Sequence, residues 1–488
     1  MAVTFSLTST GLTTIDFTDN STSFYLQEGD YLPVWATPTG DGTIPPYVTE
    51  TLPVGVNAVT YNSYASWMQN LVAFQKRAAE YWVNSQQAVP VWLNCKADGE
   101  TSARRAFVKA IHFEFRPWTE ALYQECPSSA APHDLFGTIL IERHPYWEDP
   151  TPQIFDNATM TAAASVVYDY LIEPGGDVPC RINALAVRSA TAAITLERFW
   201  MGIRSATLHG ADGVTNFKAV WECEDGGLFP DVAIDAAAEV NLASPGGGAG
   251  SFIKVTEAAV DWDDGAFHPV VSLNFATAGY AAASYEDGYG RFLCLLRVKC
   301  SAGEWEVKTS AGYVAVTTTQ PYSDPASITN TSWDYKEVGI WTLGGRNRQA
   351  IETAQIVASK DLSQIHVYAK RISGAGTLSL DCLCPIPVDE GFLEITDANV
   401  TTLYDVWFGQ GPKEDTQVIT TQDAASDVIA YITPYEVENF RLPPGDGRII
   451  CVYARESTNV FTDQIEFADI SVGDSNYTER WVSLAGTE

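Results

Sequence analysis

The chain has 488 residues, and its 61 acidic against 29 basic side chains give a formal net charge of −32. Such acidity repels phosphate backbones and anionic lipids, so it argues against sequence-specific nucleic-acid binding and against membrane adhesion. With 46% hydrophobic and 12% aromatic residues the composition is globular, and no apolar run approaches the roughly 20 residues that span a bilayer.

The first residues and the cysteines indicate a protein made in a reducing cytoplasm. Met1-Ala-Val-Thr-Phe-Ser-Leu has neither the basic nor the continuous apolar segment of a signal peptide. The nine cysteines are odd in number, none is spaced as CxxC, and most lie beside apolar residues. We therefore expect buried free thiols and no disulfide framework.

One segment departs from the β-type pattern of the rest of the chain. Most of the sequence alternates with a period near two and is rich in Thr, Val, Ile, Tyr and Trp, which predicts a mainly β fold. From about residue 63 to 84, apolar residues instead recur three and four apart, which predicts one amphipathic helix capped by Asn62 or Ser63. The apolar positions are Tyr64, Trp67, Met68, Leu71, Phe74, Ala78 and Trp82. Those expected on the wet side are Gln69, Lys76, Arg77 and Glu80.

The order of strand-like segments predicts several β units. Residues 1–155, with strands near 89–95, 106–115 and 137–148, are expected to form a β-sandwich with the helix laid on it. Residues 156–172 read as a connector, and 173–393 as a jelly-roll β-sandwich, because at least eight strands fall within it. Residues 394–488 are either a small C-terminal β domain or strands that complete an earlier sandwich.

No spacing in the chain carries a catalytic mechanism. GxxxxGK[ST], HExxH, GxSxG and GxGxxG after a strand are all missing, and the six histidines are dispersed. Paired carboxylates could in principle cleave glycosides, but 61 acids guarantee chance pairs. We therefore expect no enzyme and no cofactor, with a Ca²⁺ ion as the one exception considered next.

An acidic stretch between Lys218 and Arg291 contains twelve acids and one basic residue, Lys254. Within it, Asp261, Asp263 and Asp264 surround a tight turn, and such carboxylates suit an oxygen-preferring cation such as Ca²⁺. The twelve-residue calcium loop with a closing Glu is missing, because Ser272 stands at that position. A solvated acidic loop is the alternative reading.

Aromatic residues in the same stretch predict a glycan site. Sugars stack their apolar faces on aromatic rings while nearby carboxylates and amides bind their hydroxyls. The candidates are Trp262, Tyr280, Tyr285 and Tyr289. Packing in a core or between subunits explains the same residues, so both readings stay open.

One combination of segments is more specific than any single motif. A first strand is followed by the helix around Trp67-Met-Gln-Asn-Leu-Val-Ala-Phe, then by the hairpin Val91-Trp-Leu-Asn-Cys…Phe107-Val-Lys-Ala-Ile, and then by a strand ending Ile139-Leu-Ile-Glu-Arg-His-Pro-Tyr-Trp-Glu. This order resembles the distal tail proteins and related minor tail proteins of long-tailed (siphovirus-type) bacteriophages. The Leu442-Pro-Pro-Gly turn before a strand is similar to a pattern of the same proteins.

The resemblance implies a structural role in a virion. Residues 1–155 would be a belt domain, six copies of which close a ring that connects the distal end of the tail tube to the adhesion apparatus. The implied partners are the tail tube protein, hub or fibre proteins, and further copies of the chain. The central jelly roll would match outward-facing galectin-like or carbohydrate-binding-module-like domains, with a host-surface glycan as ligand.

A closed ring requires two different complementary patches on each subunit. Four basic residues of the first domain are candidates for pairing with a neighbour's acids: Arg104, Arg105, Lys109 and Arg116. Solvated surface charges are the alternative reading of these residues. For the whole chain, the competing functions are a trimeric carbohydrate- or receptor-binding virion protein and a β-sandwich glycoside hydrolase accessory module.

Overall fold

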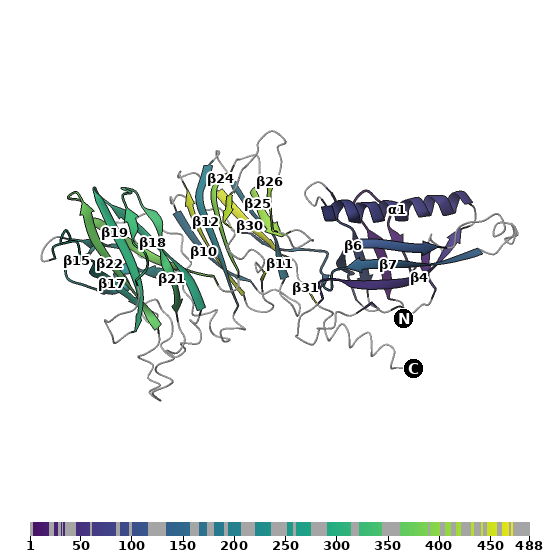
Figure 1. Ribbon diagram of the computed structural model, residues 1–488, viewed down its shortest axis with the longest axis horizontal. Coiled ribbons are helices and arrows are strands. Elements are labelled where there is room, and N and C mark those ends of the chain that lie inside the picture. The colour runs from purple at the N-terminus through teal and green to yellow at the C-terminus, as the bar shows by residue number, and fades with distance from the viewer. Residues whose placement is uncertain are drawn as a thin grey trace, which may run out of the picture.

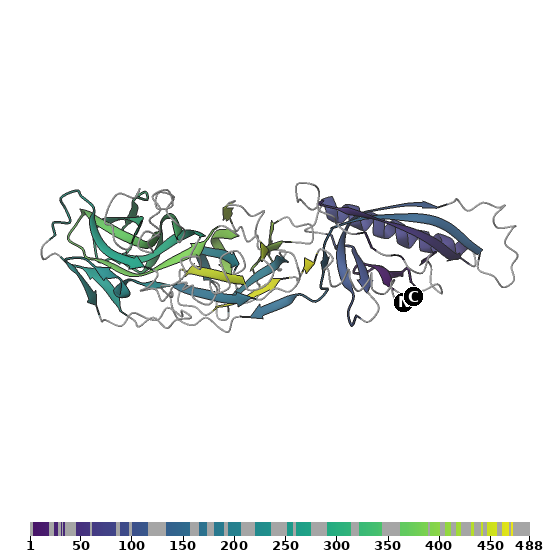
Figure 2. The same ribbon diagram turned by 90° about the horizontal axis from the view of Figure 1, so that it is seen from below.

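A computed structural model shows a mainly β protein in which three β-rich units follow one another along the long axis (Figures 1 and 2). The structure describes residues 3–18, 24–27, 31, 33–34, 45–58, 61–83, 88–96, 100–115, 133–156, 165–172, 180–189, 194–205, 220–235, 251–256, 260–274, 290–313, 322–343, 362–388, 391–400, 406–410, 416–420, 431–433, 441–442, 447–455, 461–467 and 470–471. The mainly β prediction is confirmed. Within these ranges, no helix is long and apolar enough to cross a membrane.

The first unit is one strongly bent antiparallel sheet covered by the helix (Figure 1). Its main path runs in the order β2-β1-β5-β6-β7-β4-β3. The elements are β1 (Thr4–Thr8), β2 (Ile15–Asp16), β3 (Phe24–Leu26), β4 (Val48–Ala58), α1 (Tyr61–Val83), β5 (Trp92–Lys96), β6 (Arg104–Phe115), β7 (His133–Arg143) and β8 (Trp147–Glu148), with β31 (Ile470–Ser471) added from the distant end of the chain. The bend lies in β6, whose first half pairs with β5 and whose second half pairs with β7 beyond a bulge after Val108.

Helix α1 confirms the predicted helix almost to the residue. Leu71, Phe74 and Ala78 are fully buried against the sheet, as is Tyr81 at 3% exposure. Trp67 is only half-buried, at the margin of the same core. The helix begins at Tyr61, so the predicted caps Asn62 and Ser63 lie within its first turn.

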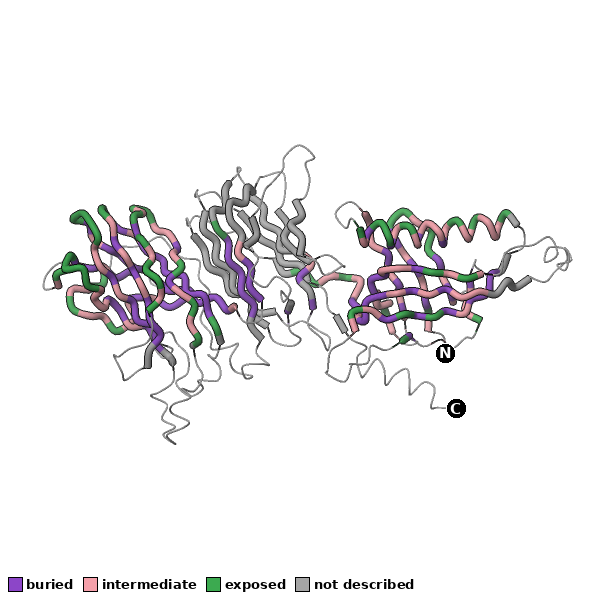
Figure 3. The backbone as a smooth tube through the Cα atoms, viewed as in Figure 1, coloured by how far each residue is buried: buried purple, intermediate pink, exposed green. Residues whose placement is uncertain are grey.

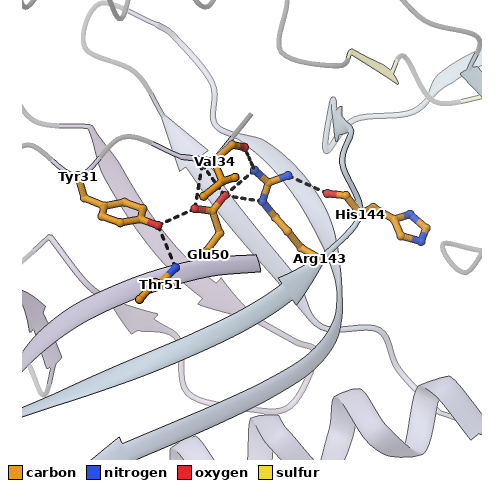
Figure 4. A network of polar contacts seen from close by, with 6 residues as sticks. All are labelled: Tyr31, Val34, Glu50, Thr51, Arg143 and His144. Carbon is orange, nitrogen blue, oxygen red and sulfur yellow. Dashed lines mark hydrogen bonds and ion pairs between the residues drawn. The ribbon is translucent and has the colours of Figure 1, made fainter. Parts of the chain in front are cut away.

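A buried ion pair joins β4 to the end of β7 (Figure 4). The guanidinium of Arg143 donates to one carboxylate oxygen of Glu50 at 2.8 and 2.5 Å, and both side chains are fully buried. Arg143 also donates to the carbonyls of His144 (2.7 Å) and Val34 (2.8 Å). Glu50 in turn accepts from the Val34 amide (3.0 Å) and the Tyr31 hydroxyl (2.7 Å). Burial lowers the pKa of Arg143, while burial and then the Glu50 charge raise the pKa of Tyr31.

The second unit is built from two segments that are far apart in sequence. One sheet has the order β10-β29-β12-β24-β27 and the other β26-β25-β11-β30-β9, with β28 paired to β11. The strands are β9 (Gln153–Asp156), β10 (Ser165–Ile172), β11 (Cys180–Ser189), β12 (Ile194–Ser205), β24 (Phe392–Val400), β25 (Val406–Gln410), β26 (Thr416–Thr420), β27 (Tyr431–Thr433), β28 (Arg441–Leu442), β29 (Gly447–Arg455) and β30 (Phe461–Phe467). We call this unit the middle sandwich.

The third unit, residues 221–387, lies between those two segments in the chain, and we call it the inserted sandwich. Its sheets have the orders β15-β16-β23-β18-β21, with β13 paired to β23, and β14-β17-β22-β19-β20. The elements are β13 (Trp221–Glu222), the 3-10 helix η1 (Cys223–Asp225), β14 (Gly227–Leu228), β15 (Val232–Asp235), β16 (Phe252–Val255), β17 (His268–Asn274), β18 (Gly290–Cys300), β19 (Glu304–Tyr313), β20 (Ala326–Ile328), β21 (Asp334–Leu343), β22 (Leu362–Ser373) and β23 (Leu378–Pro387). The buried residues of the two sheets form one large hydrophobic core, and Figure 3 marks buried positions in purple along the strands.

Two of the predicted domain boundaries are therefore wrong. Residues 173–393 are not one jelly roll, because β11 and β12 belong to the middle sandwich. Residues 156–172 are not only a connector, because they include β10, which pairs with β29. Within residues 394–488, β29 pairs with β10 and β12, and β30 pairs with β11. Alternation of polar and apolar residues locates strands, but it does not say which strands pair.

The two sandwiches meet where β12 crosses the end of β23. A Cβ on Gly202 would lie 2.4 Å from the carbonyl oxygen of Pro387 and 2.5 Å from the side chain of Ile386. Only glycine permits this approach of the two backbones. At the same junction, Trp200 packs edge-to-face on Tyr335 with ring centroids 6.4 Å apart.

The inserted sandwich buries charge as well as apolar surface. Arg297 pairs with Asp381 at 2.6 Å, and both are almost fully buried. Glu222 lies near this pair. Burial raises the pKa of Glu222 to about 8, and the negative charges of Asp381 and Glu224 add to the rise. Glu222 therefore takes up a proton when the sandwich folds at neutral pH.

The cysteine prediction is confirmed for the seven cysteines whose side chains the structure describes. All are free and buried: Cys95, Cys180, Cys223, Cys294, Cys300, Cys382 and Cys384. Burial raises the pKa of several of these thiols, including Cys223 and Cys294. Thiols of this kind are unreactive packing residues.

Candidate functional site

Trp262, the central residue of the predicted glycan site, is buried in the structure. Trp262 is 1% exposed, and its indole N–H donates to the carbonyl of Thr256 at 3.1 Å. Its ring packs against His268 and Trp305, with centroids 5.5 and 5.9 Å away. The prediction is wrong for Trp262, which belongs to the core, because acidic sequence neighbours do not show where a ring points. Tyr280, Tyr285 and Tyr289 lie outside the described residues.

The three carboxylates of the predicted Ca²⁺ site each contact protein groups. Asp261 accepts from the Asp263 amide at 3.1 Å, and Asp263 pairs with Arg371 through two contacts of 2.6 and 2.5 Å. Asp264 accepts from the Ala266 amide and contacts His268, and these two contacts lower its pKa. No group of three or more metal-ligating side chains gathers anywhere in the described part of the chain. The structure thus gives the cation-site prediction no support.

The basic residues proposed for a subunit interface were Arg104, Arg105, Lys109 and Arg116. Arg105 pairs with Glu148 of its own chain at 2.9 Å, and Lys109 pairs with Glu142 at 2.7 Å. Arg104 is half-buried at the start of β6, and Arg116 lies outside the described residues. A neighbouring subunit would have to compete with these internal acids for Arg105 and Lys109, so their role at an interface stays a prediction.

The structure brings together a different set of residues, on the outer face of the sheet β14-β17-β22-β19-β20. In β19, the core-facing residues Trp305, Val307 and Thr309 alternate with Glu306, Lys308 and Ser310. In β22, Ile365, Val367 and Ala369 face the core, so His366, Tyr368 and Lys370 share the outer face. The register places Glu306 opposite Lys370, Lys308 opposite Tyr368 and Ser310 opposite His366.

Lysines and aromatic rings make up one end of this face. The ammonium of Lys308 lies 3.6 Å from the ring centroid of Tyr322 and 4.1 Å from that of Phe267. The ammonium of Lys370 lies 4.6 Å from the Phe267 ring and pairs with Glu306 at 2.8 Å. Partial burial, and then the neighbouring charge of Lys370, lower the pKa of Lys308. We call Phe267, Glu306, Lys308, Tyr322, Tyr368 and Lys370 the lysine–aromatic surface.

Exposed apolar area on this surface is concentrated in Tyr322. Its side chain is 51% exposed, and its ring meets Tyr368 edge-to-face with centroids 5.2 Å apart. Phe267 and Tyr368 are half-buried. The surface thus presents an aromatic face beside two ammonium groups and one carboxylate, so it combines apolar area with charged hydrogen-bonding groups.

A serine–histidine pair lies at the other end of the same face. Ser272 Oγ and His366 Nδ1 are 2.6 Å apart, and burial lowers the pKa of His366, so its imidazole is neutral at pH 7. Nucleophilic catalysis by such a pair requires a third group that orients the histidine. Within the described residues, His366 Nε2 is buried without a hydrogen-bond partner. The pair therefore supplies neutral hydrogen-bonding groups rather than a catalytic triad.

Comparison with known proteins adds little to this picture. No protein-family model and no curated protein sequence matches the chain. Among solved structures, the SPP1 Dit (gp 19.1) protein, described as a paradigm of hub adsorption apparatus in phages that infect Gram-positive bacteria, is 10% identical over 78% of this chain and 98% of its own, with a TM-score of 0.23. A chain of the phage p2 baseplate in its activated conformation is 7% identical over 78% of this chain and 98% of its own, with a TM-score of 0.20. The VP2 subviral particle of infectious bursal disease virus is 8% identical over 68% and 88%, with a TM-score of 0.16. TM-scores this low do not establish a shared fold.

Proposed function

We propose that the protein is a structural component of a phage tail tip, and that its first unit forms a six-membered ring at the distal end of the tail tube. The observation that carries the proposal is the arrangement of the first unit. A first strand, helix α1, the β5–β6 hairpin and β7 occur in the order that the belt-domain resemblance implies, and the helix covers the sheet that the hairpin and β7 form (Figure 1). The proposal does not rest on the structural comparisons.

The shape of the chain suits this role. The first unit lies at one end of an elongated molecule, and the two sandwiches extend from it (Figure 2). A ring of first units would therefore carry the sandwiches away from the tube, toward an adhesion apparatus. The acidity of the chain also suits a tail whose lumen passes DNA, because a cationic wall would retain it.

The assembly state of the full-length protein tests this proposal. Light scattering should give six times the chain mass of 53.2 kDa, and negative-stain images should show a ring with an open centre. The measurement is repeated with purified tail tube protein, since some rings close only on a partner. A monomer under both conditions would contradict the ring, and a trimer would favour the receptor-binding reading.

A second role, glycan binding by the inserted sandwich, is favoured by the lysine–aromatic surface. This role replaces the predicted site around Trp262 with one on the outer face of the sheet β14-β17-β22-β19-β20, and it is compatible with a structural ring. Binding of the full-length protein to an array of bacterial glycans tests it. No signal for any glycan would contradict this accessory role and would leave the ring proposal intact.

A further inference from the structure

We propose that the lysine–aromatic surface selects acidic saccharides, meaning sugars that carry a carboxylate or phosphate group. The inference rests on the proposed glycan-binding role and specifies its ligand class. It predicts that charge, and not only stacking on Tyr322, decides which sugars bind.

Lys308 is a positively charged residue in a chain of net charge −32. Several other cations of the inserted sandwich have close acidic partners: Lys336 pairs with Asp334 at 2.6 Å, and Arg371 pairs with Asp263 at 2.5 Å. Within the described residues Lys308 has no acidic partner, and the charged group that acts on it is another cation, Lys370. In a chain with an excess of acids, Lys308 thus has an ammonium group that no acid of the described residues compensates.

The two lysines of this surface, Lys308 and Lys370, lie close to each other. Both ammonium groups lie over the Phe267 ring, and the repulsion between them contributes to the lowered pKa of Lys308. Glu306 compensates only Lys370, to which it is 2.8 Å away. An anionic group that contacts Lys308 would offset the repulsion between the two ammonium groups, so anion binding is favoured by the arrangement itself.

The surface also exposes apolar area beside the two ammonium groups. A small inorganic anion needs only the two lysines, whereas Tyr322 exposes half of its side chain next to them. A sugar ring can cover this aromatic area while its hydroxyls reach the Glu306 carboxylate of the same surface. Nucleic acid and anionic membranes extend far beyond the lysine–aromatic surface, so the acidic rest of the chain would repel them, whereas a short acidic saccharide contacts this surface alone.

Calorimetric titration of the full-length protein tests the inference with four probes. Oligogalacturonate carries carboxylates, a phosphorylated mannose oligosaccharide carries phosphate, a galactose oligosaccharide is neutral, and inorganic phosphate lacks the sugar. We expect the two acidic saccharides to bind at least about tenfold more tightly than the neutral one, because a hydrogen bond to a charged group is stronger than one between neutral groups. Whichever acidic probe binds more tightly identifies the preferred substituent.

Two substitutions assign the effect to Lys308. Lys308→Met keeps the apolar stem and removes the charge, so binding of acidic saccharides should weaken by about tenfold or more while thermal unfolding stays unchanged. Lys336→Met is the matched control: it removes a lysine from the other sheet of the same unit, and binding should not change.

Four outcomes would overturn the inference. Equal binding of neutral and acidic saccharides, or unchanged binding by Lys308→Met, would show that charge does not select the ligand, while the glycan-binding role would survive. Inorganic phosphate binding as tightly as the phosphorylated saccharide would show an anion site without sugar recognition. Failure of every saccharide to bind would refute the glycan-binding role together with the inference.

Discussion

Replacing Arg143 by Met should strongly destabilise the first unit, because it leaves the Glu50 carboxylate buried without a counter-charge. Both side chains are fully buried, so water cannot solvate the remaining charge. Breaking a buried pair by removing one partner typically costs about 3–5 kcal/mol. Arg143 also donates to the Val34 and His144 carbonyls, and these acceptors would lose their donor (Figure 4).

A double variant, Glu50→Leu with Arg143→Met, separates charge from hydrogen bonding. It removes both charges, so the unpaired buried carboxylate that destabilises the single variant is no longer there. It also leaves the Val34 amide and the Tyr31 hydroxyl without their acceptor, and each such group costs about 1–3 kcal/mol if no other partner replaces it. We therefore expect the double variant to be no less stable than Arg143→Met, with a favourable coupling of at least about 2 kcal/mol in the mutant cycle.

Hydrogen–deuterium exchange measured by mass spectrometry is the suitable assay, because a chain with three units does not unfold in two states. Peptides from β4 and β7 report on the first unit, and peptides from the inserted sandwich serve as an internal reference. Lys109→Met is the matched control: both side chains of its pair with Glu142 are partly exposed, so the change should cost at most about 1 kcal/mol. The reasoning is refuted if Arg143→Met is as mild as this control, or if the two substitutions of the double variant add without coupling.

Three further predictions follow from burial. Trp262→Ala should destabilise the inserted sandwich by about 3–5 kcal/mol, because the side chain is almost fully buried. Faster amide hydrogen exchange in β17 and β22 would report this loss, and unchanged exchange there would contradict a core position for Trp262. On α1, Phe74→Ala should cost about 3–5 kcal/mol of stability and Trp67→Ala distinctly less, because Phe74 is fully buried and Trp67 only half-buried. Amide exchange of α1 measured at increasing denaturant concentration compares the two variants, and a larger loss for Trp67→Ala would contradict this prediction. Because the pKa of Glu222 is raised from 4.5 to about 8 in the folded state, its contribution to stability is fully present below about pH 4.5 and is lost as the pH rises to 8, by at most about 1.4 kcal/mol per pH unit. Glu222→Gln should flatten this part of the stability–pH curve, and an unchanged curve would contradict the assignment.

Local patterns in the sequence were sufficient for the elements but not for their partners. The three-and-four spacing of Leu71, Phe74 and Ala78 predicted α1 because a helix has 3.6 residues per turn, whatever lies next to it. The alternation in β12 predicted a strand equally well. It could not show that β12 pairs with β29, some 250 residues later, because any strand with one apolar face satisfies the same pattern.

The candidate site illustrates the same limit. Trp262 was selected because it stands among acids in the sequence, yet its ring turns into the core. Glu306, Lys308 and Ser310 alternate with buried residues, so the sequence could have shown that they share a face. It could not have shown that Lys370 and Phe267 lie beside Lys308, since they come from β22 and from the turn before β17.

The sequence by itself determined the mainly β class, the single long helix of the first unit, and the burial of the described cysteines. Each follows from composition or from a period of two or 3.6 residues, which are properties of a short segment. Only the tertiary structure decided that the inserted sandwich interrupts the middle one, that Glu50 and Arg143 pair inside the first unit, and that two lysines share one aromatic ring. These features depend on contacts between segments that are distant in the sequence, and such contacts are determined by the burial of apolar faces against one another.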